Sequence, residues 1–361
     1  MARYVKFLVM RQQILLAFIL SAAAAPGLGQ AAGGSTTGLP EDPGGVFATF
    51  SPSYDYSAFK PWHLKATYQL SDDAGKPGGQ GSYEYWWASP QTYRSTWTRG
   101  DASYTEWHMA DGKVASQGTS GAFSYFERKL GIALVSPLTA VGELDPAQFR
   151  LDEHGVSAKN SVVTCFNTVP IAQKGGPVPP PGSGLFPSYC FNTRKQILLG
   201  VYSFGTMVMQ YSDFTRFQGK SLARIFSFHE GTRFFLTAKI DETSELSPTD
   251  PALMLPESAK PAKIDRVKID ANSAEALLVK KVPPVYPQDA KDAHIEGKVV
   301  LRAILGIDGR VCDLQLLSAP KPSLAFSAFR SVSQWEYKPY LLNGEPVEVE
   351  TMVTVTYSLG Q

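Results

Sequence analysis

Residues 62–70 alternate strictly between apolar and polar side chains. Leu64, Ala66, Tyr68 and Leu70 fall on one face of an extended chain, and the polar residues between them fall on the other. A period of two is typical of a β-strand that is buried on one face only. Further short segments of this kind follow, bounded by Gly, Pro or Asp. They predict strands at residues 83–87, 93–99, 104–109, 197–204, 207–217, 222–228 and 234–240.

One helix is predicted within this series of strands. Phe123, Phe126 and Leu130 recur at helical spacing, with charged residues between them. We therefore expect residues 52–243 to form an antiparallel half-barrel with a helix. The fold class of the whole chain is expected to be mainly β, with a smaller α+β domain at residues 264–361.

The chain is long enough for two domains. It has 361 residues, of which 43% are hydrophobic, so it can fill more than one core. Its 34 basic and 33 acidic side chains leave a net charge of +1, and no basic run stands out. Binding of nucleic acid needs a local excess of Lys and Arg, so we expect no nucleic acid partner.

The first 29 residues are typical of a signal peptide. Arg3, Lys6 and Arg11 accompany an apolar stretch at residues 14–25, and cleavage is expected after Gly29 or an earlier alanine. An apolar stretch of about a dozen residues is too short to cross a hydrocarbon core of about 30 Å. We therefore expect export to the periplasm, and a retained anchor in the inner membrane is the alternative.

Two segments are expected to be flexible connections. Residues 30–51 are rich in Gly, Ala and Pro, and we interpret them as a tether. Residues 244–263 contain several prolines, and we interpret them as a linker between the two domains.

The chain contains three cysteines. Cys165 and Cys190 each begin a Cys-Phe-Asn-Thr tetrapeptide and flank a segment rich in Pro and Gly, so they are predicted to pair in an oxidising compartment. Closing a loop of roughly 25 residues stabilises a fold by about 3 kcal/mol in the loop-closure model. Cys312 is expected to stay unpaired. A structural clamp is the favoured interpretation of the pair, and a redox switch is the alternative.

The last eighty residues contain a different order of elements. They predict a short helix at 288–293, strands at 298–305, 311–317 and 347–357, and a longer helix at 324–335. Asp308-Gly309, between two apolar runs, indicates a hairpin. In the longer helix, Phe329, Val332 and Trp335 share one side and are candidates for the core.

This segment resembles the C-terminal domain of the TonB family. The resemblance is carried by residues that occur in the family's order and spacing, namely Tyr286-Pro287, Ala290, Glu296-Gly297, Val299, Asp308-Gly309, Val311, Ala328, Val332, Trp335, Tyr337, Pro339 and Asn343-Gly344. It covers about a quarter of the chain. It implies a three-stranded antiparallel sheet with helices.

The resemblance also implies a binding role for the last strand. In the family this strand lies at a sheet edge and grips a short segment at the periplasmic face of outer-membrane receptors, because an exposed edge offers free N–H and C=O groups to an extended peptide. The residues predicted to bind peptide are Val347, Glu348, Val349, Glu350, Thr351, Met352, Val353, Thr354, Val355 and Thr356. The alternative is a plain packed edge or a dimer contact. Val353→Pro is expected to abolish binding and leave the first domain folded.

The first domain resembles the lipoprotein-carrier fold of LolA and its relatives in strand order and in the density of aromatic residues. This resemblance implies an apolar concave face that accepts lipid or acyl chains. The candidate lining residues are Tyr83, Tyr85, Trp87, Tyr93 and Trp97. The alternative is that these aromatic side chains only fill the core.

No motif in the sequence indicates catalysis, a metal or a cofactor. HExxH, close Cys/His clusters and Gly-x-Ser-x-Gly are absent, so we predict no catalytic residues, no metal site and no cofactor. The first hypothesis is a periplasmic binding or adaptor protein that engages an envelope protein, with outer-membrane receptors among the candidates. The alternative is a membrane-anchored TonB-like energy transducer for receptor-linked transport. An envelope enzyme with an unrecognised site is a third hypothesis.

Overall fold

The computed structural model describes residues 43–54, 56, 59–72, 75–138, 149–158, 161–171, 185–204 and 207–359. The predicted signal peptide and the first part of the predicted tether therefore lie outside the described residues. Among the described helices, none combines the length and the apolar character that crossing a membrane requires.

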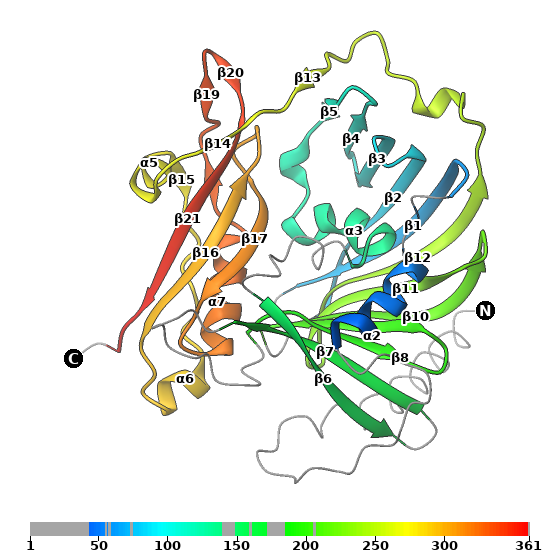
Figure 1. Cartoon of the computed structure of the whole chain (residues 1–361). Coiled ribbons are helices and arrows are strands. Elements are labelled where there is room, and N and C mark those ends of the chain that lie inside the picture. The colour runs from blue at the N-terminus through cyan, green and yellow to red at the C-terminus, as the bar shows by residue number, and fades with distance from the viewer. Residues whose placement is uncertain are drawn as a thin grey trace.

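One large antiparallel sheet builds the first domain. Its strands are β1 (Trp62–Ser71), β2 (Pro77–Ser89), β3 (Thr92–Arg99), β4 (Ala102–His108), β5 (Lys113–Gly118), β6 (Phe149–Ala158), β7 (Ser161–Pro170), β8 (Ser188–Asn192), β9 (Ile197–Ser203), β10 (Met207–Phe217), β11 (Lys220–Glu230), β12 (Arg233–Glu245) and β13 (Ala262–Lys263). Within the described residues the order of these 13 strands is β13-β5-β4-β3-β2-β1-β12-β11-β10-β9-β8-β7-β6. Strands β1 to β5 form one meander and strands β6 to β12 form another. The β1–β12 pair joins these two meanders into one sheet, which curves around helix α3 (Tyr125–Val135) (Figure 1).

A buried carboxylate fixes α3 against the sheet. Ser124 and Glu127 form a capping box at the start of the helix. The side chain of Glu127 is 0% exposed, and its Oε1 accepts hydrogen bonds from Arg99 Nε and from the Tyr68 hydroxyl, both at 2.8 Å. Trp97 Nε1 donates to the Glu127 carbonyl at 2.9 Å. Side chains of β1 and β3 thus hold the predicted helix in the concave face of the sheet.

Helix α2 (Pro43–Phe50) corrects the prediction that residues 30–51 are a flexible tether. Phe47 and Phe50 are buried, and the Phe50 ring stacks on Phe191 with centroids 4.8 Å apart. Phe47 meets Phe166 edge-on at 6.0 Å. The Gly- and Pro-rich composition indicated a tether, but two phenylalanines three positions apart give the segment an apolar side that packs on β7 and β8.

The predicted disulfide is confirmed. Cys165 of β7 and Cys190 of β8 lie directly opposite each other in the antiparallel pair and are bonded. Cys312 is free, as predicted. The predicted linker is attached to the first domain at both ends, because β12 continues to Glu245 and β13 pairs with β5. Between them lies a 3-10 turn at Pro251–Leu253.

The second domain is a four-stranded sheet covered by helices on one face (Figure 1). Its elements are β14 (Arg266–Lys268), α5 (Ala271–Ala276), β15 (Leu278–Lys280), α6 (Gln288–Asp292), β16 (Gly297–Leu305), β17 (Val311–Ser318), α7 (Pro322–Val332), β18 (Glu336–Tyr337), β19 (Leu341–Leu342), β20 (Glu345–Pro346) and β21 (Glu348–Tyr357). The sheet order is β14-β21-β16-β17. The predicted three-stranded sheet is therefore extended by β14, which pairs with β21 in parallel.

Candidate functional sites

The outer edge of β21 is covered over only part of its length. On one side, β16 pairs with β21 from Val349 to Tyr357. On the other side, β14 pairs with Glu348, Val349 and Glu350. No described strand pairs with β21 on this side beyond Glu350. The expectation that the last strand is the edge strand is therefore wrong for residues 348–350, where β14 intervenes, whereas the remainder of β21 is an open edge.

The outward peptide groups of β21 belong to its even-numbered residues. The Glu348 N–H and the Glu350 carbonyl bond to the β14 segment at 2.9 and 3.0 Å. Peptide groups of alternate residues point to opposite edges of a strand, so those of Met352, Thr354 and Thr356 continue this outward row. The side chains of these three residues are exposed. We call the row formed by their peptide groups the open edge.

The odd-numbered residues predicted to bind peptide lie elsewhere. Val347, Val349, Thr351, Val353 and Val355 are buried. From Val349 to Val355 their peptide groups face β16, because they alternate with the outward groups. The structure thus divides the ten predicted residues into a buried row, two glutamates under β14 and the three residues of the open edge.

Charged pairs hold β14 on β21. Arg266 lies 2.7 Å from Glu348, and Lys268 lies 3.1 Å from Glu350. Arg302 of β16 also donates to Glu350 at 2.9 Å. The hydrogen bond from Arg302, with that from Lys268, lowers the pKa of Glu350 to about 2. Glu350 is therefore ionised at neutral pH and joins β14, β21 and β16.

The opposite edge of this sheet, along β17, faces the first domain. Arg128 of α3 donates from Nη2 to the Val311 carbonyl at 2.6 Å, and Lys129 Nζ lies 2.6 Å from Asp313. Ser120 donates to Asp308 at 2.6 Å, just before β17 begins. Helix α3 therefore contacts both the curved sheet and the second domain.

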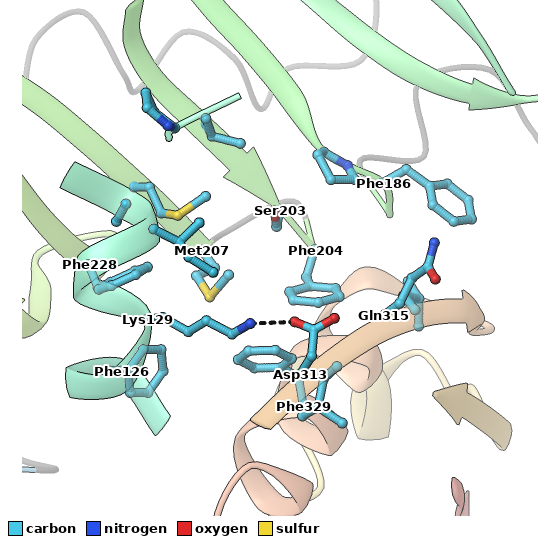
Figure 2. A pocket seen from close by; sticks show the side chains of 18 of the residues that line it. Phe126, Lys129, Phe186, Ser203, Phe204, Met207, Phe228, Asp313, Gln315 and Phe329 are labelled. Carbon is cyan, nitrogen blue, oxygen red and sulfur yellow. Dashed lines mark hydrogen bonds and ion pairs between the residues drawn. The ribbon is translucent and has the colours of Figure 1, made fainter. Parts of the chain in front are cut away.

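An apolar cavity of about 220 Å³ lies between the two domains. Its wall is rich in Phe, Met and Leu side chains, among them Phe126, Phe186, Phe204, Met207, Met209, Phe228, Leu314, Leu316 and Phe329. Figure 2 shows Phe126 of α3, Met207 of β10, Phe228 of β11 and Phe329 of α7 around this space, with the Lys129–Asp313 pair beside them. We call it the interdomain cavity.

A second cavity, of about 540 Å³, lies on the other side of α3. All five predicted lining residues contribute to its wall, namely Tyr83, Tyr85, Trp87, Tyr93 and Trp97. Tyr54, Tyr56 and Trp62 add further aromatic rings, and Glu106, His108 and Arg128 add charged groups. We call it the aromatic cavity. The structure therefore brings the five residues together, but in a wall that also carries hydroxyl, indole and charged groups.

The tyrosines of the aromatic cavity remain protonated at physiological pH. Burial raises the pKa of Tyr54 and of Tyr93 to about 12. Their hydroxyls are therefore neutral and can both donate and accept hydrogen bonds. The wall offers polar groups without adding negative charge.

Within the described part of the chain, neither a metal site nor an activated thiol is found. The described residues contain no group of three or more His, Cys, Asp or Glu side chains that could hold a metal ion. Burial raises the pKa of the Cys312 thiol to about 11, so the reactive thiolate is rare at neutral pH.

The C-terminal domain has relatives among known proteins. Residues 282–359 match the family model described as Gram-negative bacterial TonB protein C-terminal. The chain is similar to protein TonB of Vibrio cholerae, with 33% identity over 85 residues, 23% of this chain and 35% of the relative. It is also similar to protein TonB of Pseudomonas aeruginosa, with 30% identity over 77 residues, 21% of this chain and 22% of the relative. The match thus spans about a third of these relatives or less. The predicted TonB-type C-terminal domain is confirmed.

Solved structures resemble each of the two parts. The C-terminal domain of Pseudomonas aeruginosa TonB is 25% identical, with 23% of this chain and 86% of that chain covered and a TM-score of 0.21. A lipoprotein-sorting protein domain from Vibrio parahaemolyticus is 7% identical, with 58% and 94% covered and a TM-score of 0.37. A LolA superfamily protein from Nitrosomonas europaea is also 7% identical, with 58% of this chain and 97% of that chain covered and a TM-score of 0.37. The first domain therefore has LolA-like neighbours as predicted, but TM-scores this low support no statement about a ligand.

Proposed function

We propose that this chain is a cell-envelope binding protein whose TonB-type C-terminal domain captures an extended peptide of an envelope partner by β-strand addition. The observation that carries the proposal is the open edge at Met352, Thr354 and Thr356, which no described strand covers. Export to the periplasm, predicted from residues 1–29, would place this edge where segments of outer-membrane receptors are accessible.

The open edge is suited to a short extended segment. Each of its three residues carries one outward N–H and one outward C=O, and an added strand satisfies them in a regular ladder. On its other side, β21 is hydrogen-bonded to β16 from Val349 to Tyr357. A peptide would therefore add to a strand that is already held in place.

Thr354→Pro tests this proposal. Proline removes the outward N–H of residue 354, and at an edge it breaks no bond to β16. The probes are synthetic peptides of about a dozen residues, copied from the periplasmic segments of outer-membrane receptors of the same cell and measured by calorimetry. We expect the variant to lose at least tenfold in affinity, since it loses one hydrogen bond and displaces its neighbours.

Thr354→Ala is the matched control, because it removes the same side chain and keeps the N–H. It should bind like the unmodified chain. Amide exchange should also slow at Met352, Thr354 and Thr356 when peptide binds. Equal affinity of Thr354→Pro and Thr354→Ala, or protection confined to another surface, would sink the strand-addition proposal.

The first domain, in this proposal, binds a hydrophobic ligand such as an acyl chain. The interdomain cavity supports this, because its wall is made mostly of Phe, Met and Leu side chains. With decanoate as the probe, Met207→Lys should bind at least tenfold more weakly, since it places a charge in an apolar wall. Met254→Lys is the control, because Met254 is 69% exposed and lines neither cavity. Equal binding by both variants would remove the interdomain cavity from the proposal.

A membrane-anchored energy transducer for receptor-linked transport is the second candidate, favoured by the TonB proteins among the relatives. The N-terminus of the mature protein and its membrane association separate the two candidates. A start near Gln30 in the soluble periplasmic fraction favours the binding protein, and an intact Met1 in the inner membrane favours the transducer. We propose no catalytic activity for either.

A further inference from the structure

We propose that the aromatic cavity binds a saccharide ring. Its volume of about 540 Å³ lies within the range of roughly 300–1,000 Å³ that is usual for small-molecule sites. The cavity does not touch the open edge and shares only Ile132 and Ser136 with the interdomain cavity, so this inference does not depend on strand addition or on acyl binding.

The composition of the wall points to a ligand with both apolar and polar surfaces. The wall contains five tyrosines and three tryptophans and no Phe, Leu or Met. Each Tyr or Trp offers an apolar ring face and a polar group at its edge. A sugar ring has the complementary form, with C–H groups on its faces and hydroxyls around its rim. An acyl chain would use the ring faces only and would leave Trp62 Nε1, which has no partner in the described structure, unbonded.

Trp62 supplies an independent sign of a missing polar partner. Its side chain lines the cavity, the residue is only 1% exposed, and Nε1 has no hydrogen-bond partner in the described structure. Buried N–H groups are nearly always bonded, because an unbonded one costs about 1–3 kcal/mol. Nε1 is enclosed by its neighbours, so a ligand hydroxyl accepts this bond when a small shift of the indole exposes the N–H to the cavity.

Charged groups of both signs give further hydrogen-bonding capacity. Glu106 lies 3.6 Å from His108, and both line the cavity. Arg128 also lines it, and its Nε has no partner in the described residues. A carboxylate accepts from sugar hydroxyls and a guanidinium donates to them. The mixture of signs favours a neutral polyol over a cation, which would meet Arg128 as well as Glu106.

The experiment measures binding of soluble oligosaccharides to the full chain. Chitotriose and maltotriose are the probes. Their binding is measured by calorimetry and by the change in tryptophan fluorescence. We expect saturable binding of at least one probe. Trp62→Phe keeps the ring and removes the N–H, so it should weaken binding about tenfold.

Trp107→Phe is the matched control. Trp107 is also buried and its Nε1 also lacks a partner, but it lines neither cavity. It should bind the sugar like the unmodified chain, as should the edge variant Thr354→Pro. Equal weakening by Trp62→Phe and Trp107→Phe would mean a general loss of stability and would overturn the assignment.

A third arm identifies the source of the sugar. A glycolipid with a single-sugar headgroup, presented in detergent micelles, is compared with the free trisaccharides and with decanoate. Binding of the glycolipid but not of free sugar, still sensitive to Trp62→Phe, supports a headgroup as the source. Failure of all three sugar probes, or competition for this cavity by decanoate alone, overturns the proposal.

Discussion

The two edges of the C-terminal sheet are covered in different ways. At β17, the first domain supplies the cover, with Arg128 bonded to the Val311 carbonyl and Lys129 paired with Asp313. At β21, the cover is β14, three residues long, and it leaves the edge open beyond Glu350. One edge is thus covered by the first domain, and the other only in part by a strand of three residues.

This difference shows how the chain limits where another strand can add. A free sheet edge invites pairing with any extended chain, and proteins usually cover, charge or distort such edges. Along the open edge the side chains are Met352, Thr354 and Thr356, none of them charged, so this edge lacks the usual protection. With β17 against the first domain, β21 is the edge at which a partner is expected.

The largest expected effect comes from a proline on the wrong side of β21. Val353 is buried and pairs with Leu301 of β16, and its N–H faces into the sheet. Val353→Pro, proposed from the sequence as a selective test of binding, should instead break the central ladder. We expect it to destabilise the second domain by about 3 kcal/mol or more. Urea unfolding of the variant checks this.

Thr354→Pro, one residue along, is the comparison for this variant. It should lower the stability of the second domain by less than about 1 kcal/mol, because its N–H points away from β16. If the two prolines destabilise equally, the assignment of inward and outward peptide groups is incorrect, and the open edge must be redrawn.

The next effect concerns the cover of β17. Arg128→Ala removes a charged donor from the Val311 carbonyl, which should weaken the contact between the domains by about 2 kcal/mol. Cys312 reports this contact, because Arg128 Nη1 lies 3.8 Å from its sulfur. Alkylation of Cys312 by iodoacetamide should accelerate by up to about 30-fold if separation of the domains limits access.

Loss of Arg128 cannot accelerate alkylation through the acidity of the thiol. The nearby guanidinium favours the thiolate, so its removal acts in the opposite direction. Arg224→Ala, which breaks an exposed pair with Asp213, is the control and should leave the rate unchanged. An unchanged rate in Arg128→Ala as well would show that α3 does not shield β17.

The sequence predicted those elements whose side chains follow a strong pattern. The prediction of 207–217 matches β10, and the alternation at 62–70 matches β1 to within a residue. The strand β6 was not among the predicted strands, and it contains Asp152, Glu153 and His154 in succession. Three polar residues in succession carry no alternation, and their strand character comes from backbone pairing with β7.

Residues of the candidate sites that lie close together in the sequence were predicted, and those brought together only by the fold were not. The five aromatic residues of the cavity were predicted together because they occur in neighbouring strands. Trp62 was not singled out, because its unpartnered Nε1 has no signature in sequence. The interdomain cavity was missed because Lys129 and Asp313, which meet beside it, are 184 positions apart. The cover at Arg266–Lys268 is too short for any periodicity to reveal.

A smaller effect tests whether β14 is a removable cover. The pKa of Glu350 is lowered from 4.5 to about 2 in the folded chain, so its contribution to stability is present above about pH 4.5. It is lost as pH falls from there toward about 2. Below pH 4.5 we expect the Ile269 N–H, which bonds to the Glu350 carbonyl, to lose its intrinsic-rate-corrected exchange protection before the amides of β16.

Glu350→Gln should show the same loosening at neutral pH, with a cost of about 1 kcal/mol. Glu345→Gln, at an exposed position in β20, is the control and should leave Ile269 protected. If Ile269 remains protected through the acid range while β16 opens, β14 is an integral strand of the sheet. The open edge would then be confined to the residues beyond Glu350, because β14 would not leave residues 348–350.

The smallest expected effect separates the two contacts that cover β17. Lys129 and Asp313 lie 2.6 Å apart, but their side chains are 21% and 38% exposed. A partly solvated ion pair of this kind contributes about 0.5 kcal/mol or less, and salt screens it. Lys129→Ala should therefore change the alkylation rate of Cys312 by less than about threefold.

An effect as large as that of Arg128→Ala, vanishing in high salt, would mean that charge rather than the bond to the Val311 carbonyl holds α3 on β17. The cover of this edge would then depend on ionic strength, and a partner strand would have two edges to choose between in concentrated salt.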